Sequence, residues 1–290
     1  MQRGLALALV IALLALASVA EAWGPLSHYY FALQAFPTAD PYSVKQGCDL
    51  PDGFYFANWS QFPDCSVPVD AMHNGVFPGY LVQFALTSEA AKFKRDGFDP
   101  LSMALAFGSH VYADVVGFHT PYGGYLGPTV PNYATTWPHM TAIDAHVSHY
   151  IPFDPDSTMS SEVAAEFVAA GTEYAHRANA KYGVYNATAI KKCSDNWGTA
   201  GLGLIKVAKL QAASTYYQQA LIAYDQFNAT TFQQTAKHFT MANDCAVAVI
   251  QHWAQLVWKD KLHPETAFAQ SYAFSKSLFA KGSCTPYPVS

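Results

Sequence analysis

The sequence has few charged residues and almost no strand-like alternation. Asp, Glu, Lys and Arg make up 13% of the 290 residues, and the formal net charge is −5. This mild acidity argues against a protein that binds nucleic acid mainly through its charge. Segments in which apolar and polar residues alternate are scarce, which argues against a β-rich fold.

The sequence also lacks the motifs of several enzyme classes. It contains no G-x-S-x-G elbow and no cysteine-protease signature, which disfavours a serine-triad or Cys–His hydrolase. It contains no glycine-rich phosphate loop of the P-loop or Rossmann type. None of its five cysteines form a pair at metal-ligand spacing, so a metal site would depend on imidazole and carboxylate ligands.

One long apolar run is present, at the start of the chain. Residues 1–22, MQRGLALALVIALLALASVAEA, combine a basic start, a Leu/Ala/Val core and a small-residue ending. That combination is typical of a secretory signal peptide. No comparable apolar run follows, so no membrane anchor is expected. We expect a secreted protein, extracellular or in a vacuolar or lysosomal lumen, with a single domain at 23–290 that begins with Trp23.

An oxidising compartment predicts that cysteines pair. Five cysteines predict two disulfides and one unpaired thiol, and proximity in the sequence favours a local bridge between Cys48 and Cys65. Three N-x-S/T sequons predict glycosylation at Asn58, Asn186 and Asn228.

Ala-rich segments with helical periodicity dominate the rest of the chain. Start signals include Asp99-Pro100, Pro138 and Ser160-Ser161. Gly, Pro and aromatic residues predict irregular loops at 37–72 and 120–138. The prediction is an all-α fold, a single multi-helix domain with long irregular loops. The expected helices are 27–36, 75–95, 100–117, 139–150, 160–181, 199–225, 230–258 and 265–280.

The segment 106–121, AFGSHVYADVVGFHTP, is apolar nearly throughout but contains His110, Asp114 and His119. Burying such groups is costly unless something pairs with them. His110 and Asp114 are four residues apart, so both side chains can reach one ion from the same face of a helix. Gly117 offers a place for that helix to end, after which His119 can turn back towards the same cavity. The segment therefore predicts a buried metal site.

Other His and Asp residues are candidates for the same cluster. His28 lies five residues after Trp23, whose free α-amine and carbonyl oxygen would together chelate an ion. Asp52 is expected in a Pro/Gly turn, and His73 at the start of a helical stretch. The rival carboxylates of this region are Asp64 and Asp70.

The segment 137–150, WPHMTAIDAHVSHY, adds His139 and Asp144, which are five residues apart and therefore awkwardly spaced for one ion. His146 and His149 are three residues apart and form an alternative pair.

These residues resemble the pattern of the zinc-dependent phospholipase C superfamily, which includes the single-strand-specific zinc nucleases. WGPLSH has the W-G-x-x-x-H spacing of the zinc nucleases. LPDGFYF and LAFGSHVYADVVGFH are similar to the catalytic domain of glycosylphosphatidylinositol (GPI)-specific phospholipase D. This second resemblance spans most of the first 150 residues, and beyond them only helical composition is shared.

The resemblance implies a buried cluster of up to three Zn²⁺ ions. Its implied ligand sets are Asp52, His73, His110 and Asp114 for one ion; Trp23, His28 and a bridging Asp114 for a second; and His119, His139 and Asp144 for a third. The family places its last acidic ligand four residues after the preceding histidine, where this chain has Ile143. A looser first helical turn, replacement by His146, and weak binding of the third ion are the alternatives.

The resemblance further implies a secreted phosphodiesterase of the phospholipase C or GPI-phospholipase type, in which Asp52 serves as the catalytic base that orients a zinc-activated water. Its substrate would be a phospholipid or a GPI-type lipid, reached by transient contact with a membrane surface, and no stable protein partner is expected. The alternatives are a single-strand-specific nuclease, for which no basic groove is evident, and a non-catalytic metal-binding protein. The aromatic residues expected to engage lipid are Phe54, Tyr55, Phe56, Trp59, Tyr122, Tyr125 and Tyr133.

Overall fold

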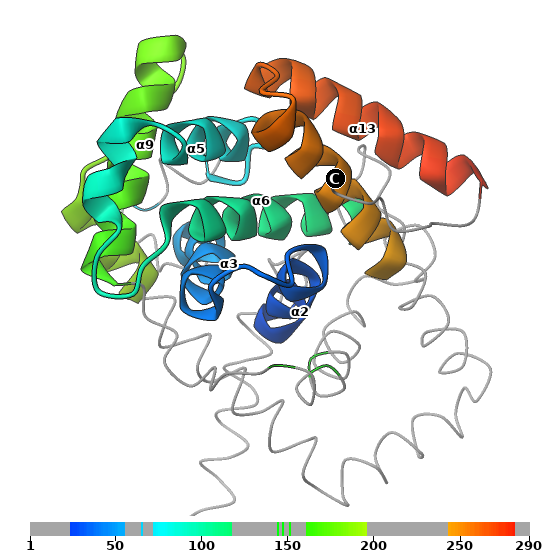
Figure 1. Cartoon of the computed structure of the whole chain (residues 1–290), viewed down its shortest axis with the longest axis horizontal. Coiled ribbons are helices and arrows are strands. Elements are labelled where there is room, and N and C mark those ends of the chain that lie inside the picture. The colour runs from blue at the N-terminus through cyan, green and yellow to red at the C-terminus, as the bar shows by residue number, and fades with distance from the viewer. Residues whose placement is uncertain are drawn as a thin grey trace, which may run out of the picture.

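The residues that the computed structural model describes are helical or lie in short connections, and no strand occurs among them (Figure 1). The all-α prediction is therefore confirmed. The buried apolar side chains of these helices form one continuous core, as expected for a single domain. The described residues are 24–55, 65, 72–117, 144, 147, 151, 161–195 and 243–281.

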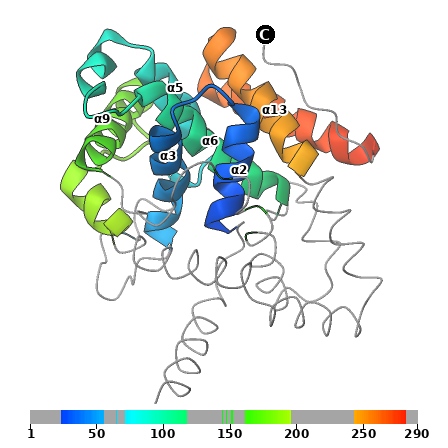
Figure 2. The ribbon, with the colours of Figure 1, turned by 60° about the horizontal axis from the view of Figure 1, so that its bottom comes forward.

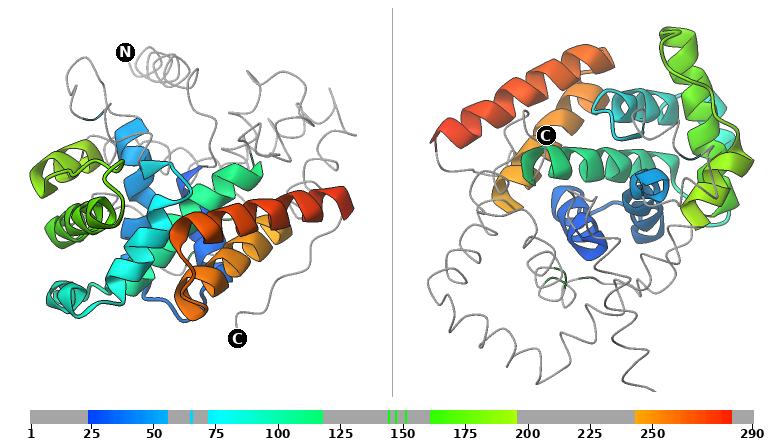
Figure 3. Two further views of the ribbon diagram at one scale, coloured as in Figure 1. Left: turned by 90° about the horizontal axis from the view of Figure 1, so that it is seen from above. Right: turned by 180° about the vertical axis from the view of Figure 1, so that it is seen from behind.

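Helix α6 (Pro100–Gly117) runs through the middle of the described structure. It packs against α2 (Pro25–Ala35) and α3 (Pro41–Tyr55) on one side and against α5 (Phe77–Ala85) on the other. The front and rear views agree on this layering (Figures 1 and 3). Residues 102–114 of α6 are all buried, as expected for a helix that is apolar on nearly every face. Any polar side chain on this stretch is therefore removed from solvent.

The remaining helices cover α5 and the far end of α6. Helix α9 (Glu162–Ala178) packs on α5 and contacts the short 3₁₀ helix η3 (Ser88–Phe93). A helix at 243–254 passes into a π-helical turn, η6 (Gln255–Lys259), and is followed by α13 (Pro264–Lys281). Figure 2 shows α13 beside this preceding helix, away from α9.

Two copies of the sequence D-P-x-S start α3 and α6. At the start of α3, Asp40 Oδ2 accepts hydrogen bonds from the backbone N–H and hydroxyl of Ser43, at 2.8 and 2.7 Å. At the start of α6, Asp99 Oδ2 accepts the same two bonds from Ser102, at 2.9 and 2.6 Å. Such side-chain caps satisfy N–H groups that have no partner inside the helix.

The two caps also bind each other. The backbone N–H of Asp40 donates to Ser102 Oγ at 3.0 Å, and that of Asp99 donates to Ser43 Oγ at 2.7 Å. This reciprocal pairing places the N-termini of α3 and α6 side by side. The two helices therefore run in the same direction from a common starting level.

Gly47 allows α3 to approach α6 closely. A Cβ atom at Gly47 would lie 2.3 Å from the carbonyl oxygen of Met103 and 2.8 Å from the backbone nitrogen of Phe107. No side chain fits there, because both neighbours belong to the backbone. Asp52 lies twelve residues after Asp40, and His110 eleven after Asp99, so both lie about 17 Å along their helices from the paired caps.

Several expected helices are confirmed, although their ends differ by a few residues. Helices α2, α6, α9 and α13 correspond to the predictions 27–36, 100–117, 160–181 and 265–280. Gly117 is the last residue of α6, as expected. The part of 230–258 that the structure describes, from 243 onward, is helical. The predicted helices at 139–150 and 199–225 and the loop at 120–138 lie outside the described residues, apart from Asp144 and Val147, which are both helical.

Two assignments from the sequence are wrong. The irregular loop at 37–72 contains α3, and Pro51 lies within this helix. Burial against α6 outweighs the weak helix preference of its Pro, Gly and polar residues. The predicted continuous helix at 75–95 is two elements, because α5 ends at Ala85 before η3 begins.

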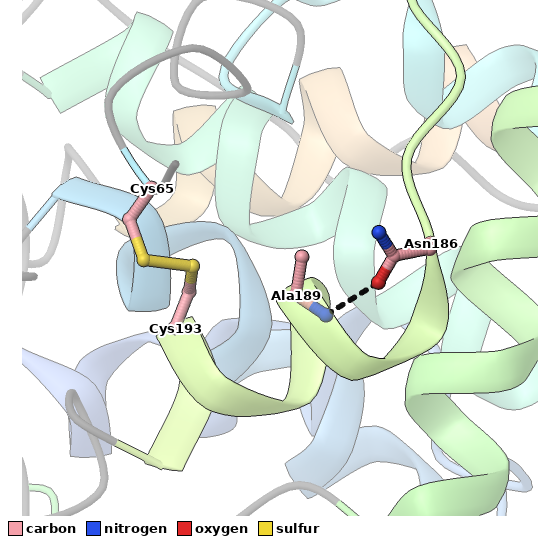
Figure 4. The surroundings of a disulfide bond; sticks show 4 residues. All are labelled: Cys65, Asn186, Ala189 and Cys193. Carbon is pink, nitrogen blue, oxygen red and sulfur yellow. Dashed lines mark hydrogen bonds between the residues drawn. A yellow bond between two sulfur atoms is a disulfide. The ribbon is translucent and has the colours of Figure 1, made fainter. Parts of the chain in front are cut away.

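The expected Cys48–Cys65 bridge is also wrong. Cys65 is joined to Cys193, 128 residues away, with a Cα–Cα distance of 5.7 Å (Figure 4). Cys245 is likewise in a disulfide, while Cys48 is free and buried between α2 and α6. One unpaired thiol was expected, and the disulfides are compatible with an oxidising compartment.

Of the three sequons, only Asn186 belongs to the described residues. Its side chain is exposed, and its Oδ1 accepts a 2.8 Å hydrogen bond from the backbone N–H of Ala189, capping the helix at 187–195 (Figure 4). Asn58 and Asn228 lie outside the described residues. None of the described helices combines the length and apolar character needed to cross a membrane.

Candidate metal centre

Four separate segments of the chain bring five predicted ligands together. Helix α2 contributes His28, α3 contributes Asp52, the turn before α5 contributes His73, and α6 contributes His110 and Asp114. The cluster lies where α2 and α3 pack against α6. The structure thus contains a buried group of His and Asp side chains that can hold a metal ion.

His110 is at the centre of the first group of ligand atoms. Its Nε2 lies 3.4 Å from Asp52 Oδ1, 3.5 Å from Asp114 Oδ2 and 3.3 Å from His73 Nε2. His73 Nε2 is also 3.5 Å from Asp52 Oδ1. One atom from each of three other residues therefore lies within 3.5 Å of His110 Nε2.

These distances fit the coordination shell of a tetrahedral ion. Bonds of 2.0–2.2 Å to nitrogen and oxygen place neighbouring ligand atoms of a tetrahedron about 3.3–3.6 Å apart. The four distances, 3.3, 3.4, 3.5 and 3.5 Å, fall in that range. Two imidazole nitrogens and two carboxylate oxygens are also a donor set that zinc and similar divalent ions prefer.

Asp114 connects this first group to His28. While its Oδ2 faces His110, its Oδ1 lies 3.5 Å from His28 Nε2. The rings of His28 and His110 are stacked, with centroids 3.7 Å apart and planes within 15° of parallel. The two oxygens of Asp114 therefore face two different histidines, so its carboxylate can serve both sides of the cluster.

The cluster is almost completely shielded from water. The side chains of His28 and His110 have no exposed surface, and those of Asp114 and Asp52 retain 1% and 4%. The side chain of His73 retains 10% and is the most exposed of the five. Solvent therefore reaches the cluster on the side of His73.

The carboxylates and histidines of the cluster shift one another's titration. Burial lowers the pKa of His110, but Asp52 and Asp114 more than offset this and raise it to about 8. Burial would raise the pKa of Asp52, but His110 and His73 hold it below its ordinary value. Burial lowers the pKa of His73. Asp52 is thus ionised, and His73 is kept neutral, as metal ligands must be.

A backbone carbonyl orients His110. The Nδ1 of its ring lies 2.7 Å from the carbonyl oxygen of Cys48. A carbonyl can only accept, so Nδ1 carries the proton, and in the neutral ring the lone pair of Nε2 faces Asp52 and Asp114. Metal-binding histidines are commonly held in this way by a partner behind the ring. The sequence alone gave no sign of this role for Cys48, because it depends on α3 lying against α6.

The turn that contains His73 is also held from α6. The hydroxyl of Tyr112 donates a 2.9 Å hydrogen bond to the carbonyl oxygen of Gly75. The ring of Phe268 fills the space next to Gly75, where a Cβ would lie 2.4 Å from it. These contacts fix the turn at the level of His110 and Asp114.

Asp144 has a clear role outside this cluster. Its Oδ1 accepts hydrogen bonds from the backbone N–H and the hydroxyl of Ser27, at 2.9 and 2.6 Å, and its Oδ2 accepts from the N–H of Leu26 at 3.3 Å. It therefore caps the N-terminus of α2 with a negative charge, and Gly24 leaves the space that it occupies. Burial raises the pKa of Asp144 to about 6.

Of the third ligand set, His119, His139 and Asp144, the structure describes Asp144 alone. His119 and His139 lie outside the described residues, as do Trp23, Asp64, Asp70, His146 and His149. Their roles as ligands stay predictions. The groups of candidate ligands found among the described residues are His28, Asp52 and His110, and His73, His110 and Asp114, and Asp144 belongs to neither.

One of the aromatic residues expected to engage lipid is placed elsewhere. Phe54 is completely buried in the core, so its expected contact with lipid is wrong. The side chains of Tyr55, Phe56, Trp59, Tyr122, Tyr125 and Tyr133 lie outside the described residues.

Comparisons with known proteins give no relative for this chain. No protein-family model matches it, and no curated protein or solved structure does so either. Function is therefore inferred from the geometry of the cluster and from the motifs of the sequence.

Proposed function

We propose that this protein is a secreted, zinc-dependent phosphodiester hydrolase that acts on phospholipids, of the phospholipase C or GPI-phospholipase type. The observation that carries the proposal is the buried cluster around His110, whose Nε2 lies 3.3–3.5 Å from an atom of His73, Asp52 and Asp114, the spacing of neighbouring ligands on one ion. A predicted signal peptide and the disulfides support secretion.

The residues present fit zinc better than calcium or magnesium. Asp52, His73, His110 and Asp114 would hold one ion, and His28 with the second oxygen of Asp114 would hold part of the shell of another. Imidazole-rich sets favour zinc, whereas Ca²⁺ and Mg²⁺ prefer shells made of oxygen atoms. Trp23 would complete the second shell if its α-amine is the start of the mature chain, and up to three ions are expected if His119, His139 and Asp144 contribute.

Zinc bound here would lower the pKa of a coordinated water towards neutrality and neutralise charge on a phosphodiester. The protein's own groups would do the rest. Asp52 would accept a hydrogen bond from the attacking water and orient it. His110, oriented by the carbonyl of Cys48, would supply Nε2 as a ligand beside Asp52 and Asp114. Substrate would approach on the side of His73, where the cluster meets solvent.

The choice of lipid over nucleic acid comes from the sequence. The motifs around Asp52 and His110 resemble those of the GPI-specific phospholipase D catalytic domain, and the net charge of −5 does not favour a polyanionic substrate. The W-G-x-x-x-H spacing at Trp23 supports the second candidate, a single-strand-specific nuclease.

The test is to assay the purified, signal-cleaved protein, with Zn²⁺, against phosphatidylcholine vesicles, a GPI-anchored protein and single-stranded DNA. We expect lipid hydrolysis that a chelator abolishes and added zinc restores. Asp52→Asn should retain the fold and lose activity by about 10²-fold or more, as expected for a positioned base. Cleavage of DNA alone would replace the proposal by its alternative. Zinc binding without turnover on any of the three substrates would leave a metal-binding protein.

A further inference from the structure

Helices α2 and α3 are joined by two polar contacts directly behind the metal centre. The hydroxyl of Tyr29 donates a short hydrogen bond to Asp49 Oδ1. One residue earlier on both helices, the thiol of Cys48 lies 3.5 Å from the carbonyl oxygen of His28. His28 and Cys48 belong to the centre and its support, so the Tyr29–Asp49 pair is adjacent to both.

The Tyr29–Asp49 pair is fully inside the protein. Tyr29 has no exposed surface and Asp49 retains 3%. Withdrawing a carboxylate from water is costly, and an apolar pair of similar size is commonly as stable or more so. A contact of this kind fixes a geometry, because its hydrogen bond forms only when the hydroxyl and the carboxylate lie at one distance and direction.

The geometry that this contact fixes is the position of His28. Among the described ligands, His28 is the one that α2 supplies, and it faces Asp114 Oδ1. One group of candidate ligands, His28, Asp52 and His110, contains this residue of α2, whereas the other, His73, His110 and Asp114, does not. A change in the position of α2 relative to α3 therefore disturbs the first group and leaves the second in place.

We propose that Tyr29 and Asp49 are positioning residues for the His28 half of the metal centre, in which His28 lies with Asp52 and His110 and faces Asp114. The proposal rests on the proposed function only in that the cluster binds zinc. Residues that orient a ligand from behind typically change metal affinity by about 10- to 100-fold when they are replaced.

The test is calorimetric titration of the metal-free protein with Zn²⁺, for the wild type and for Tyr29→Phe. His28→Ala and His73→Ala identify which binding step belongs to each half of the centre. In Tyr29→Phe, the step lost in His28→Ala should weaken by about 10-fold or more, and the step lost in His73→Ala should keep its wild-type affinity. Asp49→Leu should behave like Tyr29→Phe, whereas Asp49→Asn keeps an acceptor oxygen for Tyr29 and should retain both steps.

Tyr80→Phe is the matched control. Tyr80 also donates its hydroxyl to a carboxylate, that of Glu265, but at the junction of α5 and α13. The Tyr80→Phe substitution should lower the free energy of unfolding without changing the zinc affinity of either binding step. The proposal is overturned if Tyr29→Phe binds zinc like the wild type, or if Tyr29→Phe and Tyr80→Phe weaken both steps alike. Selective loss of the His28 step in a protein without phosphodiesterase activity would support this inference and refute the proposed function.

Discussion

Two regions of the molecule gather ionisable side chains from distant parts of the chain. One is the cluster around His110 between α2, α3 and α6. The other lies at the start of α13, where the carboxylate of Glu265 accepts hydrogen bonds from Tyr80 (2.9 and 3.0 Å) and from Asn179 Nδ2 (3.3 Å). His263 Nδ1 lies 2.6 Å from the same carboxylate and Lys181 Nζ lies 3.8 Å from it.

The two regions balance their charge differently. At Glu265, one carboxylate is surrounded by donors and by a lysine, so the protein itself supplies the compensating groups. In the buried cluster, each ion pair found among the described residues joins a histidine to an aspartate. Without a bound ion, the positive charge beside Asp52 and Asp114 is that of protonated His110, whose pKa these carboxylates raise to about 8. A metal ion can replace that proton and balance the two carboxylates, whereas the Glu265 junction already has its compensating groups.

Replacing the carboxylate of Asp114 should have the largest effect on the buried cluster and none on the Glu265 junction. Asp114→Asn removes the charge that both halves of the centre share, so it should abolish zinc binding at both. Zinc at 100 times its dissociation constant stabilises a one-site protein by about 2.7 kcal/mol, and this gain should be lost. Elemental analysis of the protein and thermal unfolding with and without Zn²⁺ measure both effects.

Glu265→Gln is the control for Asp114→Asn, since it removes a carboxylate from the other region. It should retain the zinc content and the zinc-induced stabilisation of the wild type. Equal loss of zinc in both variants, or full zinc content in Asp114→Asn, would contradict the comparison.

Gly47→Ala should test whether close packing of α3 on α6 builds the cluster. The new methyl group would collide with the carbonyl oxygen of Met103, and such overpacking typically costs about 1–3 kcal/mol. Separation of the helices should also move Asp52 away from His110 and weaken zinc binding. Chemical unfolding of the metal-free protein and zinc titration measure the two effects.

Gly97→Ala is the matched control for Gly47→Ala. Gly97 has a φ of 76° and open space around its Cα, so alanine there should cost about 1–2 kcal/mol through its left-handed backbone conformation. Because Gly97 lies outside the helices, the zinc affinity of the Gly97→Ala protein should match that of the wild type. Unchanged zinc affinity in Gly47→Ala would show that the cluster does not depend on this contact.

The smallest expected effect is a pH dependence at the Glu265 junction. Burial would raise the pKa of Glu265, but the hydrogen bonds from Tyr80 and Asn179 and the nearby His263 hold it below its ordinary value. The folded protein therefore binds fewer protons than the unfolded chain between the two pKa values. The stabilisation is complete above the ordinary carboxyl pKa and is lost as the pH falls through the lowered pKa of the folded state.

Glu265→Gln should remove this part of the pH dependence. Because Glu265 is partly exposed, the effect should be about 1 kcal/mol or less. Urea unfolding of the metal-free protein at a series of acidic pH values measures it, and an equal slope in the wild type and the variant would contradict the assignment. The presence of chelator throughout keeps the buried cluster from contributing through zinc.

Local patterns determined much of what could be predicted. The apolar character of 100–117 and the Asp99-Pro100 start predicted α6 and its burial, because helix periodicity and capping depend on neighbours in the sequence. The spacing of His110 and Asp114 places both on one helix face for the same reason. Residue type and position made Asp52, His73 and His28 candidates and the resemblance of short motifs grouped them, although no spacing in the sequence showed that they meet.

Only the tertiary structure decided how those residues come together. Asp52 reaches His110 because two D-P-x-S caps bind each other and Gly47 lets the helices approach, and these contacts join segments about sixty residues apart. Tertiary contacts also make 41–55 a helix where a loop was predicted, pair Cys65 with Cys193 and not with Cys48, and place Asp144 as a cap at the N-terminus of α2. A sequence fixes which residues can share one helix face, whereas contacts between helices depend on the fit of whole surfaces.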